Sequence, residues 1–176
     1  MRNTTIQFFF ILVFSCINIK CKKTNTPDPD NPYGLPNATQ TGANTFACRI
    51  NNTLWISRTG IYYMGAEINN DSLGITGSPK FENYFADLIL EIKGDLQENK
   101  VYNLNSTTNL STYISNSNCF GVSSNAISTK GVNGVIKLTR LDKSNKIVSG
   151  LFNFSIPIPN CDTLKVTDGR FDIKYY

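Results

Sequence analysis

The sequence predicts an all-β fold, an antiparallel β-sandwich or a barrel-like meander, that follows a signal peptide and a disordered tether. From Phe46 onward, apolar residues recur at every second position, which is the pattern of half-buried strands. Clusters of Asn, Asp, Ser and Gly separate these short runs and favour turns. Charged residues make up only 17% of the chain, and Asn, Ser and Thr take their place, which is typical of an exported β-protein.

The chain begins with a predicted secretion signal at residues 1–15. Arg2 precedes Phe8–Phe14, a continuous apolar run that is too short for a membrane-spanning helix of about 20 residues. The signal ends in Val-Phe-Ser-Cys16, which looks like the site where a lipoprotein signal is cleaved and its cysteine acylated. Cys21 stays an alternative, because Cys21-Lys-Lys looks like the start of many mature lipoproteins. We therefore expect a lipid anchor to the outer membrane, on its periplasmic face or at the cell surface.

Residues 16–39 are predicted to be a flexible linker. The run Thr-Pro-Asp-Pro-Asp-Asn-Pro32, with Pro36 shortly after it, fixes backbone angles and removes hydrogen-bond donors. Such a segment is expected to be extended and to make no packing contacts. The all-β domain is then expected to cover residues 40–176.

Alternating runs in the first half of this domain predict two hairpins. Residues 46–50 and 54–56 flank Asn51-Asn52-Thr53, and residues 61–68 and 72–77 flank Asn69-Asn70-Asp71. Residues 81–93 fit both a helical and an alternating period, and the Gly94-Asp95 that follows favours a strand.

The second half is predicted to end in long strands. Residues 105–130 are rich in Ser, Thr and Asn and are expected to be mostly loop. Residues 134–141 and 147–158 form a predicted hairpin, and residues 164–175 form two short strands around an Asp168-Gly169 turn.

Composition excludes several classes of function. The net charge of +4 is too small and too scattered for a nucleic-acid interface. The chain contains no histidine, the commonest general base and metal ligand, so we expect no enzyme and no cofactor. Cys48, Cys119 and Cys161 are too far apart in sequence for a zinc site, so no metal is expected.

The same three cysteines lead to two further expectations. Cys48 falls on the inward face of its strand and is expected to be a buried apolar residue. Cys119 and Cys161 lie beside predicted strands in an oxidising setting. They are expected either to form a disulfide with each other or to remain free thiols, and both alternatives stay open.

Two groups of polar and aromatic residues are candidate sites. Tyr62 and Tyr63 are the predicted binding surface, because adjacent residues of a regular strand face opposite ways and one must reach solvent. Trp55 and Tyr84 are expected in the core. Arg170 and Asp172, two residues apart, are expected to form an exposed ion pair rather than a catalytic group; Asp168 stands beside them.

Both ends of the domain carry a family resemblance. Thr41-Gly-Ala-Asn-Thr-Phe46 with Cys48, then Ile147-Val-Ser-Gly150, then Asp168-Gly-Arg-Phe-Asp-Ile-Lys-Tyr175 occur in the expected order and spacing. Together they resemble a family of Bacteroidetes lipoproteins of unknown function. The matching stretches lie near the two ends of residues 35–176. The resemblance implies lipid anchoring and a β-rich domain, but no activity.

The function expected from the sequence is that of a non-enzymatic, lipid-anchored envelope protein. Its partner would be a glycan, a peptide or another envelope protein, with no nucleic acid. The rivals are a purely structural protein and a hydrolase that uses carboxylates alone, as glycosidases do. The candidate acids of that hydrolase are Glu67, Glu82, Asp87 and Glu91.

Overall fold

The computed structural model describes residues 34–80, 87–104, 111–114, 133–156 and 162–176. All regular structure in these ranges is β, which confirms the predicted fold class. The strands are β1 (Thr45–Ile50), β2 (Thr53–Ile56), β3 (Met64–Asn69), β4 (Ser72–Gly77), β5 (Leu88–Lys93), β6 (Val101–Leu104), β7 (Ser111–Ile114), β8 (Asn133–Asp142), β9 (Ile147–Ile156) and β10 (Leu164–Lys174).

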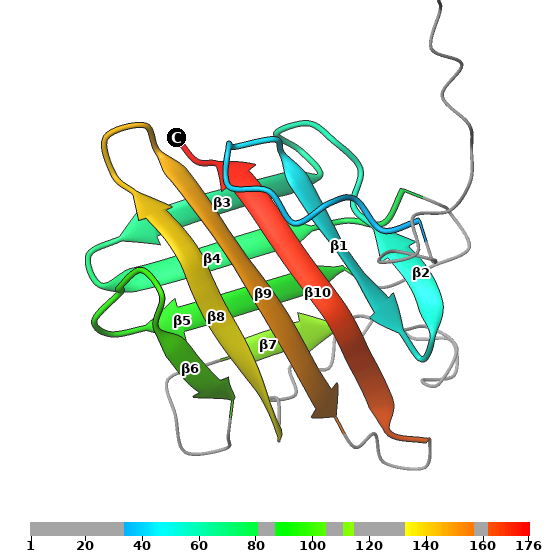
Figure 1. Ribbon diagram of the computed structural model, residues 1–176. Coiled ribbons are helices and arrows are strands. Elements are labelled where there is room, and N and C mark those ends of the chain that lie inside the picture. Colours follow the sequence, from blue (N-terminus) through cyan, green and yellow to red (C-terminus); the bar gives the residue numbers. More distant parts are fainter. Residues whose placement is uncertain (1–33, 81–86, 105–110, 115–132, 157–161) are drawn as a thin grey trace, which may run out of the picture.

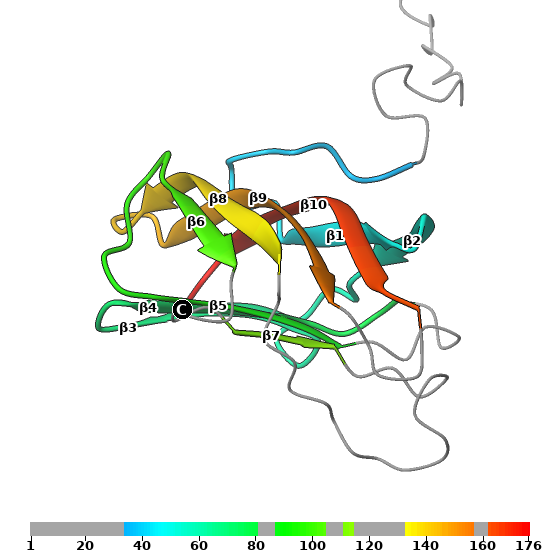
Figure 2. The same ribbon diagram turned by 90° about the horizontal axis from the view of Figure 1, so that it is seen from below.

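The strands form two antiparallel sheets, so the fold is the sandwich of the two predicted alternatives. The larger sheet has the order β2-β1-β10-β9-β8-β6, and the smaller has the order β3-β4-β5-β7. The strands of one sheet cross those of the other at a steep angle (Figure 1), and the two layers are separate when viewed from below (Figure 2). The described part of the chain contains no helix that is long and apolar enough to cross a membrane.

Both predicted hairpins in the first half are confirmed. Ile50 pairs with Thr53, which leaves Asn51 and Asn52 as a two-residue turn with φ of 47° and 65°. Positive φ at both positions is the signature of a type I′ turn, and asparagine tolerates it well. Between β3 and β4, Asn69 pairs with Ser72, which leaves another two-residue turn, and its first residue, Asn70, has φ of 52°.

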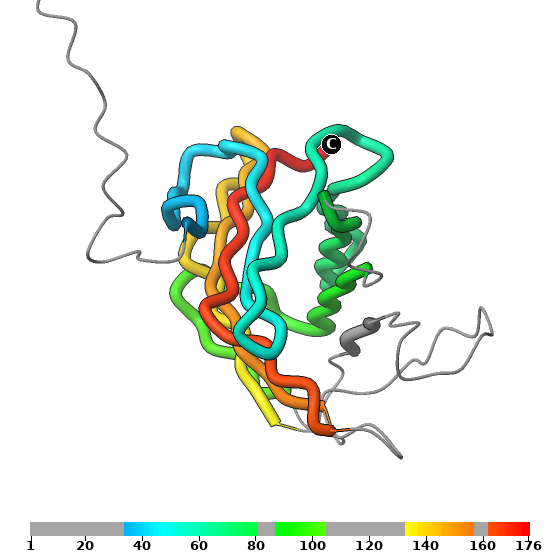
Figure 3. The backbone as a smooth tube through the Cα atoms, turned by 90° about the vertical axis from the view of Figure 1, so that its right-hand side faces the viewer, coloured from blue at the N-terminus to red at the C-terminus, as the bar shows by residue number. Residues whose placement is uncertain are grey.

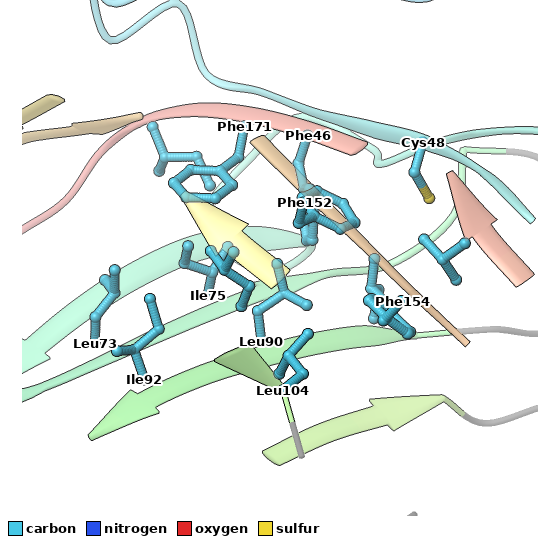
Figure 4. Packing of buried hydrophobic residues seen from close by; sticks show 14 of the residues in the cluster. Phe46, Cys48, Leu73, Ile75, Leu90, Ile92, Leu104, Phe152, Phe154 and Phe171 are labelled. Atoms are coloured by element: carbon cyan, nitrogen blue, oxygen red, sulfur yellow. The ribbon is translucent and has the colours of Figure 1, made fainter. Parts of the chain in front are cut away.

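The core lies between the sheets. Phe46, Phe152 and Phe171 point from the larger sheet toward Ile75 and Leu90 of the smaller one (Figure 4), and each of the five is almost fully buried. Trp55 packs edge-on against Phe46 with 5.2 Å between ring centroids, which confirms its predicted place in the core. Tyr84 lies outside the described residues.

Two predicted element boundaries are wrong. The strand expected at 61–68 begins only at Met64, because residues 61–63 form a turn closed by a hydrogen bond from the Met64 amide to the Gly60 carbonyl. The expected Asp168-Gly169 turn is instead a bulge inside the continuous strand β10, with Asp168 at φ 53°. Residues 88–93 form the predicted strand, and residues 81–86 of that prediction lie outside the described ranges.

Residues 34–44 run across the outer face of the larger sheet, and we call this segment the strap. It lies on the side away from the smaller sheet in Figures 2 and 3, and it leads into β1. Leu35 is buried, and the Pro36 carbonyl accepts a hydrogen bond from the Arg170 guanidinium. The expectation that the linker makes no packing contacts up to residue 39 is therefore wrong for these residues, because they find partners on the sheet.

All strands and all buried core residues that the structure describes fall between Leu35 and Tyr175. This part of the chain therefore contains its own hydrophobic core, and a domain of its size buries enough surface to fold alone.

Candidate functional site

The candidate binding surface is the loop that joins β2 to β3. Ile61, Tyr62 and Tyr63 are 69%, 88% and 42% exposed, which makes this loop the largest run of exposed apolar side chains in the described residues. Sequence reasoning placed Tyr62 and Tyr63 on opposite faces of a strand. They instead occupy a turn, where both side chains reach solvent.

Hydrogen bonds fix the base of this loop. The buried Ser57 hydroxyl lies 3.1 Å from the Ser78 carbonyl and 3.3 Å from the Tyr63 carbonyl. The Ser78 amide donates to the Tyr63 carbonyl at 2.7 Å, and the Arg58 amide donates back to the Ser78 carbonyl at 2.8 Å. These bonds join the loop to the segment that follows β4, so its backbone is ordered before any partner arrives.

Arg58 also orients one of the two tyrosines. Its guanidinium carbon lies 5.2 Å from the centre of the Tyr63 ring, and its Nε donates to the Pro79 carbonyl at 2.9 Å. The cation over the ring attracts the π-electrons and limits the rotation of Tyr63. Tyr62, beside it, keeps both ring faces open to solvent.

Asp172 forms a second polar centre, where it binds the strap. Its side chain is 1% exposed, although the sequence predicted an exposed ion pair with Arg170. One carboxylate oxygen accepts hydrogen bonds from the Thr39 hydroxyl at 2.6 Å and from the amides of Thr41 and Ala43, both at 3.0 Å. The predicted pair is therefore wrong: Arg170 turns to backbone carbonyls, and Asp172 is buried by the strap.

The other carboxylate oxygen of Asp172 completes the centre. It accepts from the Gly42 amide at 2.8 Å and from the buried Ser149 hydroxyl at 2.7 Å. Burial alone raises the pKa of Asp172, but the hydrogen bonds from Thr39, Ala43, Ser149 and Gly42 outweigh it and lower the pKa to about 2. The group is thus ionised at neutral pH and holds the strap in place.

A shallow polar pocket of about 520 Å³ lies beside the strap, near the turn between β8 and β9. Two of its charged groups are paired with each other: Arg140 lies 2.6 Å from Asp142, and it also donates to the Gln40 carbonyl at 2.7 Å. Hydrogen bonds from Asn145 and Arg140 hold the pKa of Asp142 well below its usual range. Glu98 accepts a hydrogen bond from the Leu141 amide at 3.1 Å, so this carboxylate also has a partner within the protein.

Two of the carboxylates proposed for a hydrolase lie in one row of the smaller sheet. Glu67 and Glu91 both pair with Gly74, which places them on the outer face of the smaller sheet, one on each side of β4. Glu67 accepts a hydrogen bond from Asn69, and Glu91 lies 3.2 Å from Lys93. Asp87 is exposed before β5, and Glu82 lies outside the described residues.

The structure describes one of the five cysteines, Cys48. Cys48 is buried with a free thiol, and desolvation raises its pKa above the usual range, which confirms its predicted apolar role. Cys16, Cys21, Cys119 and Cys161 all lie outside the described residues. Within the described ranges, no three His, Cys, Asp or Glu side chains gather in a way that could hold a metal ion.

The Asp172 centre is the feature that sequence reasoning missed. Its signal was present, because Thr41-Gly42-Ala43 belongs to the opening motif of the domain and Asp172 to its closing motif. The two motifs are side by side in space, with one supplying the donors and the other the acceptor. Local periodicity does not reveal such a contact, since its partners lie about 130 residues apart.

Comparison with known proteins gives one match. The family DUF6252, a domain of unknown function, matches residues 43–172. No curated protein and no solved structure matches the chain. The matched range begins within the strap and ends at Asp172, so it contains the sandwich and the carboxylate that binds the strap. The chain belongs to the DUF6252 family, whose function is unknown.

Proposed function

We propose that this chain is a lipid-anchored envelope protein whose sandwich binds a partner, without catalysis, through the loop of Ile61, Tyr62 and Tyr63. The observation that carries the proposal is the exposure of these three neighbouring side chains on a loop with a fixed base. Exposed aromatic residues with ordered backbones are enriched among the residues that dominate binding energy.

The chemistry of the loop favours a partner with both apolar and polar groups. Tyr62 offers two ring faces for the C–H groups of a sugar or for an apolar side chain, and its hydroxyl offers a hydrogen bond. Arg58 adds a positive charge at the base of the loop. A glycan or an extended peptide fits this combination.

The anchoring half of the proposal rests on the apolar run Phe8–Phe14 and the cysteine at its end. We expect the full chain, expressed in a bacterium, to incorporate radiolabelled palmitate. Cys16→Ser should abolish the label and Cys21→Ser should preserve it. The reverse result would move the anchor to Cys21, and an unlabelled wild-type chain would refute lipid anchoring.

The binding half is tested at Tyr62. We expect immobilised protein to retain envelope glycans or peptides on an array, and Tyr62→Ala to reduce that retention by about tenfold or more. Tyr176→Ala is the matched control, because Tyr176 is 85% exposed but lies at the end of the chain after β10. Equal retention by both variants would show that the loop is not the binding surface.

A further inference from the structure

The outer face of the larger sheet carries basic and apolar side chains beside the strap. We call this surface the basic face and define it by Val101, Lys137, Leu151, Lys165 and Arg170. The register places four of them in one row: Val101 pairs with Lys137, Lys137 with Leu151, and Leu151 with Arg170. The row crosses β6, β8, β9 and β10, on the side that faces the reader in Figure 1.

The basic face also exposes two apolar side chains to solvent. Val101 is 50% exposed and Leu151 is 41% exposed, although both stand on strands whose alternate residues fill the core. Lys137 lies between them in the row, and Lys165 is exposed nearer the start of β10. Apolar area surrounded by flexible cations is typical of proteins that rest on a membrane surface.

The positive charge of this face is not cancelled by its neighbours. Arg170 donates to the carbonyls of Asp168 and Pro36, which are neutral acceptors, so its charge persists. In the described ranges, the ion pairs formed on this face involve Arg49 with Asp168 and Arg140 with Asp142, and none includes Lys137 or Lys165. The Asp172 carboxylate, which the strap encloses, adds one negative charge to this face, so the three cations Lys137, Lys165 and Arg170 still leave it with a net positive charge.

The opposite side of the sandwich has a different character. The outer face of the smaller sheet presents Glu67 and Glu91 with Lys93. The two outer faces thus differ in the sign of their charge, and an anionic surface would attract only the larger sheet.

We propose that the basic face docks onto a bilayer surface that contains anionic phospholipid headgroups. This inference rests on the proposed lipid anchoring, and the strap supports it. The strap crosses the same outer face and contacts it through Pro36 and Arg170, so the chain reaches the sandwich on the side of the basic face.

The reach of the preceding chain strengthens the argument. Residues 17–33 separate Cys16 from the strap and span at most about 60 Å when fully extended. An anchor at that distance keeps the local concentration of headgroups high, so a weak electrostatic contact is enough to orient the domain. The Tyr62 loop, at the end of the sandwich, then stays accessible to a partner.

The test uses residues 24–176, which contain all the described strands and core residues. This fragment lacks both candidate anchor cysteines and also Lys22 and Lys23. Cosedimentation is measured with phosphatidylcholine vesicles and with vesicles in which about one third of the lipid is phosphatidylglycerol. We expect binding to the anionic vesicles only, with an affinity that falls as salt rises.

Charge-reversal variants assign the binding to this face. Each basic residue near an anionic surface contributes about fivefold in affinity, so K137E/K165E should weaken binding by about 25-fold or more. Lys93→Glu is the matched control on the opposite face and should bind as the wild type does. Circular dichroism and thermal unfolding should be unchanged in all three proteins, because these lysines are exposed.

Three results would overturn the proposal. These are equal binding to both vesicles, an unaffected K137E/K165E variant, or an equal loss in Lys93→Glu. A concentration-dependent dimer that K137E/K165E abolishes would assign the face to a second copy of the chain instead. The fragment 24–176 lacks both candidate anchor cysteines, so its binding to vesicles does not depend on acylation. A failed palmitate experiment would therefore refute the lipid anchor, and a failed vesicle experiment would refute docking of the basic face.

Discussion

At the scale of the residue, Asp172 shows how a single buried charge can be stabilised. Its two oxygens accept from the strap amides of Thr41, Gly42 and Ala43 and from three hydroxyls, so donors surround both oxygens. Hydrogen bonds to an ionised group are roughly twice as strong as neutral ones, which compensates for burial of the charge.

Asp172→Asn should therefore lower the free energy of unfolding by about 2–3 kcal/mol. Backbone N–H groups donate to both carboxylate oxygens of Asp172. The asparagine side chain has only one oxygen, so in either rotamer its NH₂ group faces N–H donors and those hydrogen bonds are lost. Urea denaturation monitored by Trp55 fluorescence measures the change. Asp87→Asn is the control: Asp87 is exposed before β5, so its replacement should cost under about 0.5 kcal/mol.

At the scale of the element, close approach between neighbouring strands of the larger sheet fixes where glycine is required. A Cβ on Gly150 of β9 would lie 2.4 Å from the Phe171 ring, whereas a Cβ on Gly74 of β4 would meet no atom within 4 Å. The ring of Phe171 thus occupies the space that a side chain at position 150 would need, while the outer face over β4 is open.

Gly150→Ala should destabilise the protein by about 1–3 kcal/mol, since Phe171 must leave its rotamer or the strands must separate. Gly74→Ala should be neutral or slightly stabilising, because alanine loses less conformational freedom than glycine on entering a strand. Thermal unfolding of both variants gives the comparison. Equal melting temperatures would show that the Phe171 ring can move away from residue 150 without loss of stability.

The elements also show what sequence reasoning can and cannot reach. Period-two alternation and the Asn-Asn turn located β1 and β2, because both signals are local in the chain. The bulge at Asp168 was read as a turn, since a residue with positive φ followed by glycine looks the same in both. Residues 34–39 of the strap are predicted to be an unpacked linker, because their partners Arg170 and Asp172 lie far away in sequence. The exposure of Tyr62 was predicted, but its position in a turn was not.

At the scale of the whole molecule, the ionisation of Asp172 links stability to pH. The pKa of Asp172 in the folded state is about 2, below the value of about 3.9 for an aspartate in an unfolded chain. A lowered pKa stabilises the folded state above the unfolded value and loses that contribution as pH falls. We therefore expect a loss of about 2 kcal/mol between pH 4 and pH 2, measured by urea denaturation across that range.

The same measurement on Asp172→Asn provides the control. This variant has no carboxyl group to titrate at position 172. Its loss of stability between pH 4 and pH 2 should therefore be smaller than that of the wild type by about 2 kcal/mol. Identical pH profiles for the two proteins would contradict the assignment of acid sensitivity to Asp172.

The position of the strap also determines how the sandwich would respond to mechanical force. A pull on the chain ahead of Gly34 reaches the sheet first at Arg170 and Asp172, both on β10, a strand with a neighbour on each side. The load would then shear several hydrogen bonds at once instead of peeling β1 and β2 from the sheet edge one bond at a time. A protein held at a cell envelope under flow would thereby keep its fold while its tether is stretched.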